Sequence, residues 1–200
     1  MTKKIVALFG SNVQGGNTDK LLTEAIRGAE EAGCTVERVN IVQTKLSGCK
    51  QIYHCMDTEH CVIKDEGEHY LTMLKEADGI IIATPVMTYG IPGHLKSFMD
   101  RCQPFYMAKY HRNTSFITAE HAKIRKTLFI CIAGMDVPDV FIGPLLTVKA
   151  FCHIIDAKYF DELLQNDMDT IKKIESKPEV LKAAYEKGRA LGEAITKSRG

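Results

Sequence analysis

A glycine-rich segment at residues 10–18 (GSNVQGGNT) follows a short apolar run near the start of the chain. It contains three glycines and several hydrogen-bonding side chains, but neither lysine nor arginine. Glycines let a backbone fold closely around an anion, and Ser11, Asn17, Thr18 and the first N–H groups of a following helix can donate to it. The lysine of a P-loop is absent, and the glycine spacing is not that of dinucleotide folds. The segment predicts a neutral cradle for one phosphate monoester, or else an ordinary turn between strand and helix.

A second segment, residues 84–93 (TPVMTYGIPG), combines two prolines and two glycines with apolar and aromatic side chains. Such a stiff loop can hold the edge of a flat heterocycle with backbone groups, while Met87 or Tyr89 packs on a face of the ring. The alternative is a packed turn in which Pro92 begins the next helix. Gly134 stands at the end of a third apolar run and by itself indicates little.

These loops need a scaffold that brings them together. Apolar runs at 79–84 and 125–133 are too short for buried helices and are typical of strands covered on both faces. Helical patterns lie between the strands, and Asn17 or Thr18 can cap the first helix. Alternating elements predict an open, doubly wound α/β sheet of five parallel strands, whose carboxyl ends collect the loops. The expected strands are 3–9, 35–42, 79–84, 125–133 and 156–164, and the expected helices 19–32, 68–77, 92–102, 139–153, 167–176 and 178–197.

Length and composition limit the class of protein. Two hundred residues predict one domain, 1–200, with irregular insertions at 43–65 and 103–123. Twenty-six basic against 25 acidic residues give a net charge of +1, which argues against nucleic acid as a partner and against an acidic electron shuttle. We find no secretory signal and no apolar run of about 20 residues, so we expect a soluble cytoplasmic protein that does not contact membranes.

The first two loops together resemble those of the flavodoxin-like NAD(P)H-dependent FMN reductases and the related iron-sulfur flavoproteins. The resemblance covers about residues 3–164 and implies a flavodoxin-like sheet of strand order 2-1-3-4-5 with helices on both faces. It implies FMN as cofactor, NAD(P)H as reductant, and flavins near the contacts of a homodimer or homotetramer. In this resemblance the phosphate and ribityl chain are held by Ser11, Asn12, Gln14, Gly16, Asn17 and Thr18. The ring is wrapped by Pro85, Val86, Met87, Thr88, Tyr89 and Gly90, and closed by Gly134 and Met135. Asn12-Val13 replaces the usual Pro-Arg, which leaves the preference for a pyridine nucleotide open.

Three cysteines lie in the first insertion, and the chain has seven. Cys49, Cys55 and Cys61 match three of the four cysteines that bind a [4Fe–4S] cluster in the iron-sulfur flavoproteins, and Ile52 occupies the place of the other. A cubane cluster requires a fourth ligand. We therefore expect free thiols at these positions rather than a metal site, with a site completed by His54 or His60, or a thiol redox pair, as alternatives. The remaining cysteines, in helix or strand patterns, are expected in the core: Cys34, Cys102, Cys131 and Cys152.

The expected function is an FMN-dependent oxidoreductase that passes electrons from NAD(P)H or a reduced carrier to a quinone, flavin or other small acceptor. The alternatives are an iron-sulfur flavoprotein electron-transfer protein, a non-catalytic flavodoxin-type carrier and a phosphate-binding module without flavin. No catalytic acid or base is required. Lys96 and Arg101 are expected in solvent or at a subunit contact. The aromatic side chains of the second insertion, Tyr106, Tyr110 and Phe116, with His111, are expected over the flavin, at an interface or in the core.

Overall fold

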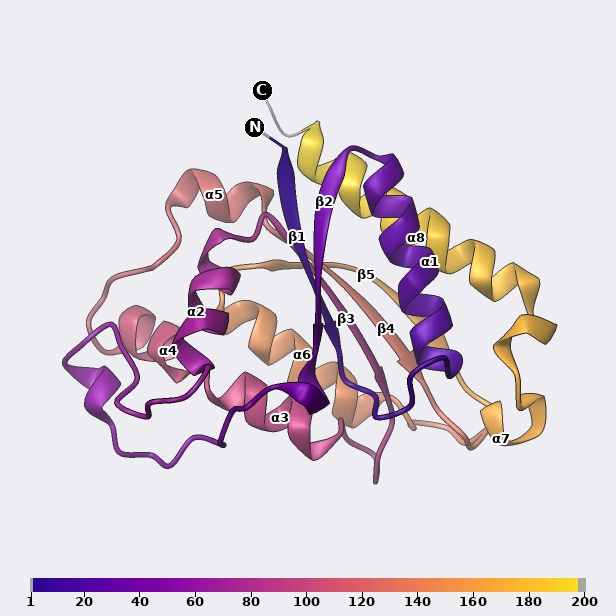
Figure 1. Cartoon of the computed structure of the whole chain (residues 1–200), viewed down its shortest axis with the longest axis horizontal. Coiled ribbons are helices and arrows are strands. Elements are labelled where there is room, and N and C mark those ends of the chain that lie inside the picture. The colour runs from indigo at the N-terminus through magenta and orange to yellow at the C-terminus, as the bar shows by residue number, and fades with distance from the viewer. Residues whose placement is uncertain (1, 198–200) are drawn as a thin grey trace.

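The computed structural model describes residues 2–197. Its centre is one parallel sheet of β1 (Lys3–Phe9), β2 (Cys34–Asn40), β3 (Gly79–Pro85), β4 (Lys126–Ile132) and β5 (Lys158–Gln165). The strand order is β2-β1-β3-β4-β5, as Figure 1 shows, and this confirms the predicted order. Because the chain turns outward in opposite directions from β1 and β3, the loops after these two strands adjoin at the carboxyl edge of the sheet.

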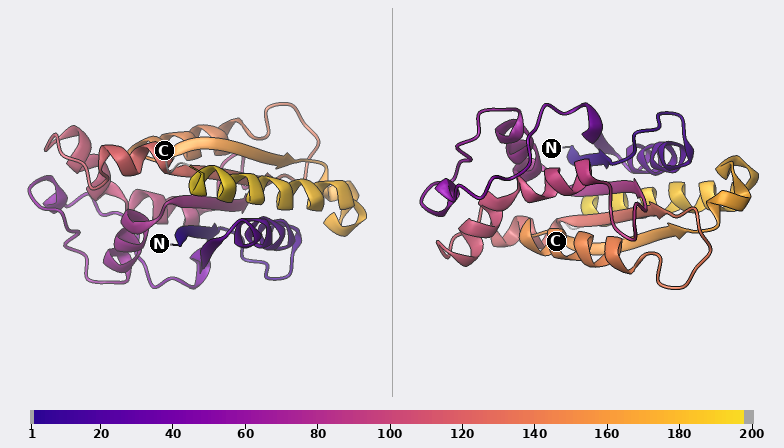
Figure 2. Two further views of the ribbon diagram at one scale, coloured as in Figure 1. Left: turned by 90° about the horizontal axis from the view of Figure 1, so that it is seen from above. Right: turned by 90° about the horizontal axis from the view of Figure 1, so that it is seen from below.

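Helices cover both faces of the sheet, as the doubly wound class requires. Their bounds are α1 (Asn17–Glu31), α2 (Gly67–Glu76), α3 (Gly93–Asp100), α4 (Gln103–Tyr110), α5 (Ala119–Ile124), α6 (Ile142–Ile154), α7 (Met168–Ile171) and α8 (Pro178–Thr196). One face carries α1 and α8, and the other carries α2, α3, α4 and α6 (Figures 1 and 2).

The central strands are apolar at nearly every position because each one contributes to two cores. In β1, Val6 and Leu8 pack under α2 and α3, whereas Ile5, Ala7 and Phe9 pack under α1 and α8. This is why the strands appear in the sequence as continuous apolar runs instead of alternating patterns. All four cysteines expected in the core, Cys34, Cys102, Cys131 and Cys152, are buried.

Glycines allow α1 and α8 to approach until their backbones touch. A Cβ on Gly28 would lie 2.1 Å from the carbonyl oxygen of Tyr185, and one on Gly188 would lie 1.9 Å from that of Ala25. Any side chain at either position would push the helices apart. This contact fixes α1, and with it the helix start that faces the glycine-rich loop.

The predicted helix over 167–176 is wrong, because the structure divides it. α7 ends at Ile171, Lys172 has a φ of 63°, and a separate 3₁₀ turn follows at Ile174–Ser176. Asn17 is bound to this break: its Nδ2 donates to the carbonyl of Lys172 (2.8 Å) and its Oδ1 accepts from the N–H of Ile174 (3.0 Å). The side chain therefore fixes a distant segment and does not cap α1. The capping residue of α1 is Gly16, which has no side chain to cap with.

The second insertion is more regular than predicted. Residues 103–123 contain α4 and most of α5, with Pro104 in the first turn of α4. α4 lies beside the first insertion, where Arg112 donates to the carbonyls of Cys55 and Thr58. The two insertions thus support each other at one side of the molecule, at the left of Figure 1.

Candidate cofactor site

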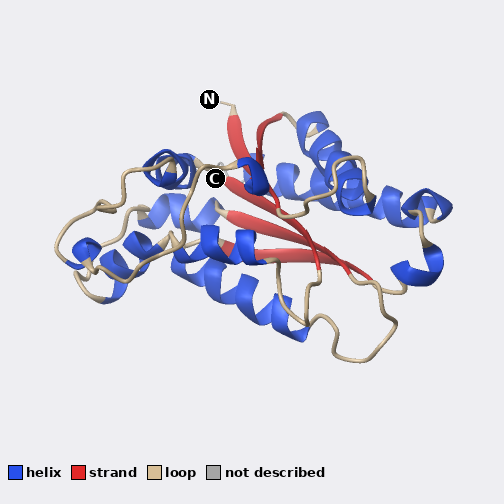
Figure 3. Ribbon diagram, turned by 60° about the horizontal axis from the view of Figure 1, so that its bottom comes forward, coloured by secondary structure: helices blue, strands red, loops and turns tan. Residues whose placement is uncertain are grey.

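Three loops meet at the carboxyl edge of the sheet, which is turned forward in Figure 3. The N–H of Gly10 donates to the carbonyl of Ala83 (2.8 Å), and the N–H of Val86 donates to that of Ile132 (2.7 Å). These bonds join the ends of β1, β3 and β4. The three loops expected to carry the chemistry are therefore neighbours.

The first loop ends at the start of α1, where backbone N–H groups can donate to a ligand. The first bond of the helix runs from the N–H of Lys20 to the carbonyl of Gly16 (3.0 Å), so the N–H groups of Asn17, Thr18 and Asp19 precede the helical ladder. Such N–H groups and the positive end of the helix dipole favour a bound anion. Gly15 has a φ of 71°, and the hydroxyl of Ser11 accepts from the N–H of Val13 (3.2 Å), which shape the loop around this point.

Sequence reasoning missed a positive charge beside this helix start. Arg38, on the edge strand β2, donates to Asp19 Oδ1 (2.7 Å), and its guanidinium lies 4.4 Å from the centre of the Phe9 ring. Burial raises the pKa of the Asp19 carboxyl, but hydrogen bonds from Arg38 and from the N–H of Gly15 outweigh it, and that pKa lies below its ordinary value. The pair keeps Asp19 ionised while cancelling most of its charge. Only the parallel pairing of β2 with β1 brings Arg38 here, so no local motif indicates it.

The second loop is a tight turn with an unusual backbone. Met87 and Gly90 exchange both N–H to carbonyl bonds (2.9 Å each), and Thr88 and Tyr89 between them have φ values of 49° and 58°. Two positive φ values define a type I′ turn, which Asn-Gly fits best, and they strain a β-branched and an aromatic residue. The two bonds that close the turn do not use the N–H groups of Thr88 and Tyr89. The side chains of Met87 and Tyr89 are 57% and 51% exposed.

A glycine in α6 holds this turn in place. A Cβ on Gly143 would lie 2.0 Å from the carbonyl oxygen of Tyr89, so only glycine lets the helix meet the turn. The third loop is also fixed by close contact. Asp169 in α7 donates its N–H to the carbonyl of Gly134 (2.9 Å), and a Cβ on Gly134 would lie 2.6 Å from Asp169 Oδ1. Met135, next to it, is 48% exposed.

The residues expected to hold the cofactor differ in accessibility. Ser11 and Thr18 are buried, and the half-buried ones are Gly16, Asn17, Pro85, Val86, Gly90 and Gly134. The exposed ones are Asn12, Gln14, Met87, Thr88, Tyr89 and Met135. All lie in the three loops, at the last residue of β3 (Pro85) or at the start of α1. The structure therefore places them along one edge, with exposed apolar side chains next to a helix start.

The three cysteines of the first insertion line one small cavity. It measures about 20 Å³ and is bordered by Cys49, Cys55, Cys61 and Arg101. This volume holds about one water molecule. Among residues 2–197, no group of three His, Cys, Asp or Glu side chains is arranged to hold a metal ion. Burial raises the pKa of the Cys55 thiol, with smaller effects in the same direction from the neighbouring Cys61 and Cys49. The arrangement does not fit an iron-sulfur cluster.

The expectation that Arg101 lies in solvent or at a subunit contact is wrong. Its side chain is 2% exposed and forms a two-pronged ion pair with Asp65 (2.7 and 2.9 Å). It also donates to the carbonyl of Ser47 (2.8 Å). These bonds hold the pKa of the Asp65 carboxyl well below its ordinary value, against the opposing effect of burial. Arg101 follows α3, so it ties the cysteine-containing segment to the helix that begins after the strained turn. Lys96, in contrast, is exposed as expected.

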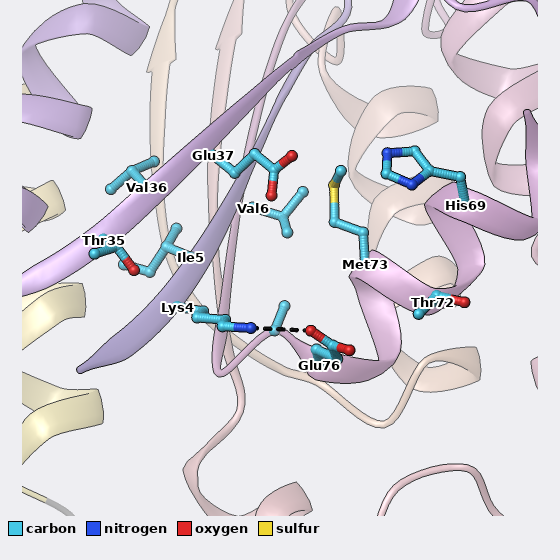
Figure 4. A pocket seen from close by; sticks show the side chains of 11 residues that line it. Lys4, Ile5, Val6, Thr35, Val36, Glu37, His69, Thr72, Met73 and Glu76 are labelled. Atoms are coloured by element: carbon cyan, nitrogen blue, oxygen red, sulfur yellow. Dashed lines mark hydrogen bonds and ion pairs between the residues drawn. The ribbon is translucent and has the colours of Figure 1, made fainter. Parts of the chain in front are cut away.

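A much larger hollow lies elsewhere. It has a volume of about 470 Å³ and opens between α2 and the amino ends of β1 and β2. Figure 4 shows Val6 and Met73 facing into it, with the Lys4–Glu76 ion pair (2.9 Å) at its rim. Ligands of doubly wound sheets bind at the carboxyl ends of the strands. The three loops at the carboxyl edge, rather than this hollow, are therefore the candidate cofactor site.

Comparison with known proteins shows to which family the chain belongs. The sequence model of the family described as NADPH-dependent FMN reductase matches residues 3–124. The chain belongs to this family. An iron-sulfur flavoprotein of Methanocaldococcus jannaschii is 34% identical over 110 residues, which cover 55% of this chain and 57% of that relative. The chain spans about half the length of the curated relatives it matches.

Solved structures of low sequence identity share the fold. An NAD(P)H:quinone oxidoreductase from Methanothermobacter marburgensis aligns with a TM-score of 0.71 at 17% identity, over 96% of this chain and 98% of its own. An FMN-dependent NADH-azoreductase from Bacillus anthracis, solved in complex with FMN, aligns with a TM-score of 0.66 at 15% identity, over 99% of this chain and 100% of its own. Within residues 2–197, no helix is both long and apolar enough to span a membrane.

Proposed function

We propose that this chain is an FMN-dependent oxidoreductase that passes electrons from NAD(P)H or a reduced carrier to a quinone, a flavin or another small acceptor. The observation that carries the proposal is the meeting of a helix start with free N–H groups and a strained turn with exposed apolar side chains at one edge of the sheet. Membership of the FMN reductase family supports it.

In this proposal the start of α1 binds the phosphate of FMN. The N–H groups of Asn17, Thr18 and Asp19 donate to it, and Ser11, Asn12, Gln14 and Gly16 line the phosphate and ribityl chain. The amide of Asn17 already bonds to residues 172 and 174, so its contribution comes from the backbone. Because Arg38 balances Asp19, the carboxylate does not repel the phosphate strongly.

The turn holds the ring. Pro85 and Val86 lead into it, Met87 and Tyr89 pack on the ring, and the N–H groups of Thr88 and Tyr89 donate to its polar edge. Gly90, Gly134 and Met135 complete the border. When bound, FMN supplies the capacity to accept a hydride or single electrons and to pass them on. Fixed backbone donors at the ring edge stabilise negative charge there without reorganisation. The chain's task is thus to bind and orient, and it needs no side-chain acid or base.

We also propose that the protein acts as a homo-oligomer in the cytoplasm, a homodimer or homotetramer. The number of exposed apolar side chains around the turn supports association, since isolated monomers rarely expose so many in one region.

A second candidate is an electron-transfer protein with an iron-sulfur cluster in the first insertion. The names of the curated relatives favour it, as do the three cysteines around one cavity. The isoleucine at position 52 weighs against it, as does the lack of a metal-ligand group of three His, Cys, Asp or Glu side chains among residues 2–197.

An anaerobic visible spectrum with metal analysis tests the proposal. We expect the purified protein, incubated with FMN and freed of excess, to retain flavin absorbance that NADH or NADPH bleaches and a soluble quinone restores. A colourless protein that gains no flavin absorbance would refute the proposal in favour of a phosphate-binding module. Retained flavin that neither NADH nor NADPH bleaches would favour a carrier that receives electrons from another protein.

A further inference from the structure

The three cysteines of the first insertion do not fit an iron-sulfur cluster, yet they share the border of one cavity with a buried cation. The cation is Arg101, whose side chain is 2% exposed. Cys61, on the same border, is only half-buried, so a small molecule can reach this position from solvent. A partly exposed thiol next to a positive charge is typical of a reactive cysteine and not of a structural one.

Arg101 and Cys61 interact directly. Burial lowers the pKa of the Arg101 guanidinium, but its hydrogen bonds to Asp65 and the negative charge of an ionised Cys61 outweigh burial, and that pKa lies above its ordinary value. A hydrogen bond between Arg101 and Cys61 acts in the same direction. The sulfur therefore lies beside the guanidinium, and negative charge that develops on this sulfur is stabilised there.

The guanidinium of Arg101 also has a donor that oxygen atoms leave unused. Its terminal nitrogens donate to Asp65 (2.7 and 2.9 Å) and to the carbonyl of Ser47 (2.8 Å). Its Nε–H is buried, and no oxygen atom of residues 2–197 accepts from it. A buried N–H without a good acceptor is unfavourable, and a neutral thiol is only a weak acceptor. An oxygen atom attached to the sulfur of Cys61 would be a better one.

A second thiol and a little empty space adjoin Cys61. Cys55 is 8% exposed and borders the same cavity, whose volume of about 20 Å³ holds one water-sized group. The carbonyl of Cys55 accepts from Arg112, which fixes this side of the cavity. Residues 57–66, which carry Cys61, belong to no helix or strand. This stretch can therefore move its sulfur toward that of Cys55.

The cysteine-containing segment is also open to small molecules on another side. A hollow of about 260 Å³ is bordered by Cys49, Cys55 and polar side chains of α3 and α4. Between these two cysteines, Gln51 and Tyr53 have positive φ values of 52° and 62°. Backbone strain of this kind gathers at functional sites. The segment thus combines access, a reactive position and a neighbouring thiol.

We propose that Cys61 is a redox-active thiol that small hydroperoxides oxidise, and that Cys55 converts the product to a disulfide. In the first step the sulfur of Cys61 attacks one oxygen of the hydroperoxide, and the O–O bond breaks. The sulfur keeps that oxygen as a sulfenic acid, to which the Nε–H of Arg101 donates. The other oxygen takes the thiol proton and leaves as an alcohol, or as water when the oxidant is hydrogen peroxide.

In the second step the sulfur of Cys55 attacks the sulfur of Cys61. The S–S bond forms, the S–O bond breaks, and the hydroxyl leaves as water with the proton of the Cys55 thiol. The two sulfurs lose two electrons in all, and the hydroperoxide accepts them. A small dithiol reverses the change by thiol–disulfide exchange. No step uses flavin or metal, so this site is independent of the proposed function.

Peptide mass spectrometry of the full-length protein tests the pairing. After one equivalent of hydrogen peroxide is added to the reduced protein, we expect a disulfide between Cys55 and Cys61 that a dithiol removes. In Cys55→Ser the sulfenic acid has no partner thiol, so a cyclic dione, which traps sulfenic acids, should label Cys61. A disulfide that contains Cys49, dione labelling of Cys49 in place of Cys61, or a wild type that forms no disulfide would overturn the proposal.

The rate of peroxide consumption identifies the attacking sulfur. Cys61→Ser should consume hydrogen peroxide at least about tenfold more slowly than the wild type, because the reactive sulfur is gone. Cys49→Ser is the matched control, since Cys49 is also half-buried and borders the same cavity. It should stay within about twofold of the wild type. Equal rates for Cys61→Ser and the wild type, or equal slowing by both variants, would contradict the assignment of Cys61.

Discussion

Thr88 and Tyr89 adopt left-handed backbone conformations that few residues of their kind tolerate. Strain of this kind costs on the order of 1–3 kcal/mol per residue and gathers at sites of function. The turn is closed by two hydrogen bonds and held against Gly143, so the surrounding structure maintains the strain. The strained turn carries the exposed side chains of Met87 and Tyr89, and these side chains link the turn to ligand binding.

Relief of this strain is measurable. Thr88→Asn should raise the free energy of unfolding of the FMN-free protein by about 1 kcal/mol, because asparagine tolerates the left-handed region better. It should leave FMN affinity nearly unchanged, since the backbone is kept. Tyr89→Gly should stabilise the protein similarly but weaken FMN binding about tenfold, because the ring contact is lost. Urea unfolding and titration of flavin fluorescence give both quantities. A Thr88→Asn variant less stable than the wild type would contradict the account of the turn.

The buried Arg101–Asp65 pair predicts a dependence of stability on pH. Asp65→Asn leaves the Arg101 charge buried and unpaired, so we expect a loss of about 3 kcal/mol at pH 7. The pKa of Asp65 is lower in the folded than in the unfolded protein. Its stabilisation is therefore complete above the unfolded value near pH ~4 and is lost as the pH falls below that value. The difference in free energy of unfolding between the wild type and Asp65→Asn should therefore become smaller as the pH falls below about 4.

Urea unfolding at a series of pH values checks this prediction. Asp57→Asn, at an exposed aspartate of the same segment, is the control and should track the wild type at every pH. If the free energies of unfolding of Asp65→Asn and the wild type differ by the same amount from pH 7 to pH 3, the ion pair is excluded as the source of that difference.

The predicted loop residues share one property: they belong to contiguous motifs, so their expected roles follow from near neighbours in the chain. The glycine-rich cradle and the residues of the turn are contiguous motifs. Arg38 and Arg101 were missed or misplaced because their partners, Asp19 and Asp65, come from other elements. Arg125 is similar: it is fully buried and donates to the carbonyls of Leu74 and Ile155, and no local pattern predicts a buried arginine.

At the scale of elements, α6 determines where the turn lies. Gly143→Ala would place a Cβ against the carbonyl of Tyr89 and displace the turn. We expect FMN affinity to fall at least tenfold, with a moderate loss of stability of about 1–3 kcal/mol. Gly93→Ala is the matched control, because a Cβ there meets no atom within 4 Å. Titration of flavin fluorescence compares the two. Equal affinities for FMN would show that the position of the turn does not matter.

Strands were predicted better than helices for a physical reason. The five strands are apolar or alternate within short windows, and every one lies within a few residues of its expected position. The helix expected over 167–176 fails because Asn17, about 155 residues away, bonds to the backbone where the chain breaks. The 103–123 segment lacks a helical pattern strong enough to show α4 and α5. Burial of four of its residues and contact with the first insertion stabilise α4, whereas α5 has no buried residue and begins at Thr118, whose side chain caps it.

For the whole molecule, the near balance of charge favours a flavin reductase over an acidic electron shuttle. Acidic shuttles are steered to their partners by charge, and a net charge of +1 provides little of this. We therefore expect the rate of NAD(P)H oxidation with a neutral quinone to change less than about twofold between low and physiological salt. Stopped-flow traces at several ionic strengths check this. A steep fall with salt would contradict this expectation and indicate local positive charge at the place where the anionic NAD(P)H binds.

The cysteine-containing segment makes a second prediction about the whole protein. With three cysteines and, among residues 2–197, no group of three side chains arranged to hold a metal ion, anaerobically purified protein should contain less than one iron atom per chain and no stoichiometric acid-labile sulfide. Iron and sulfide analysis decides this. Four iron atoms per chain would show that the segment rearranges around a cluster and would favour the electron-transfer candidate.

The account depends most on where FMN binds, and a crystal structure of the FMN complex tests this directly. We predict the phosphate at the N–H groups of Asn17, Thr18 and Asp19, and the ring against Met87 and Tyr89. FMN in the hollow between α2 and the amino ends of β1 and β2, or its absence from crystals soaked with excess FMN, would contradict the account.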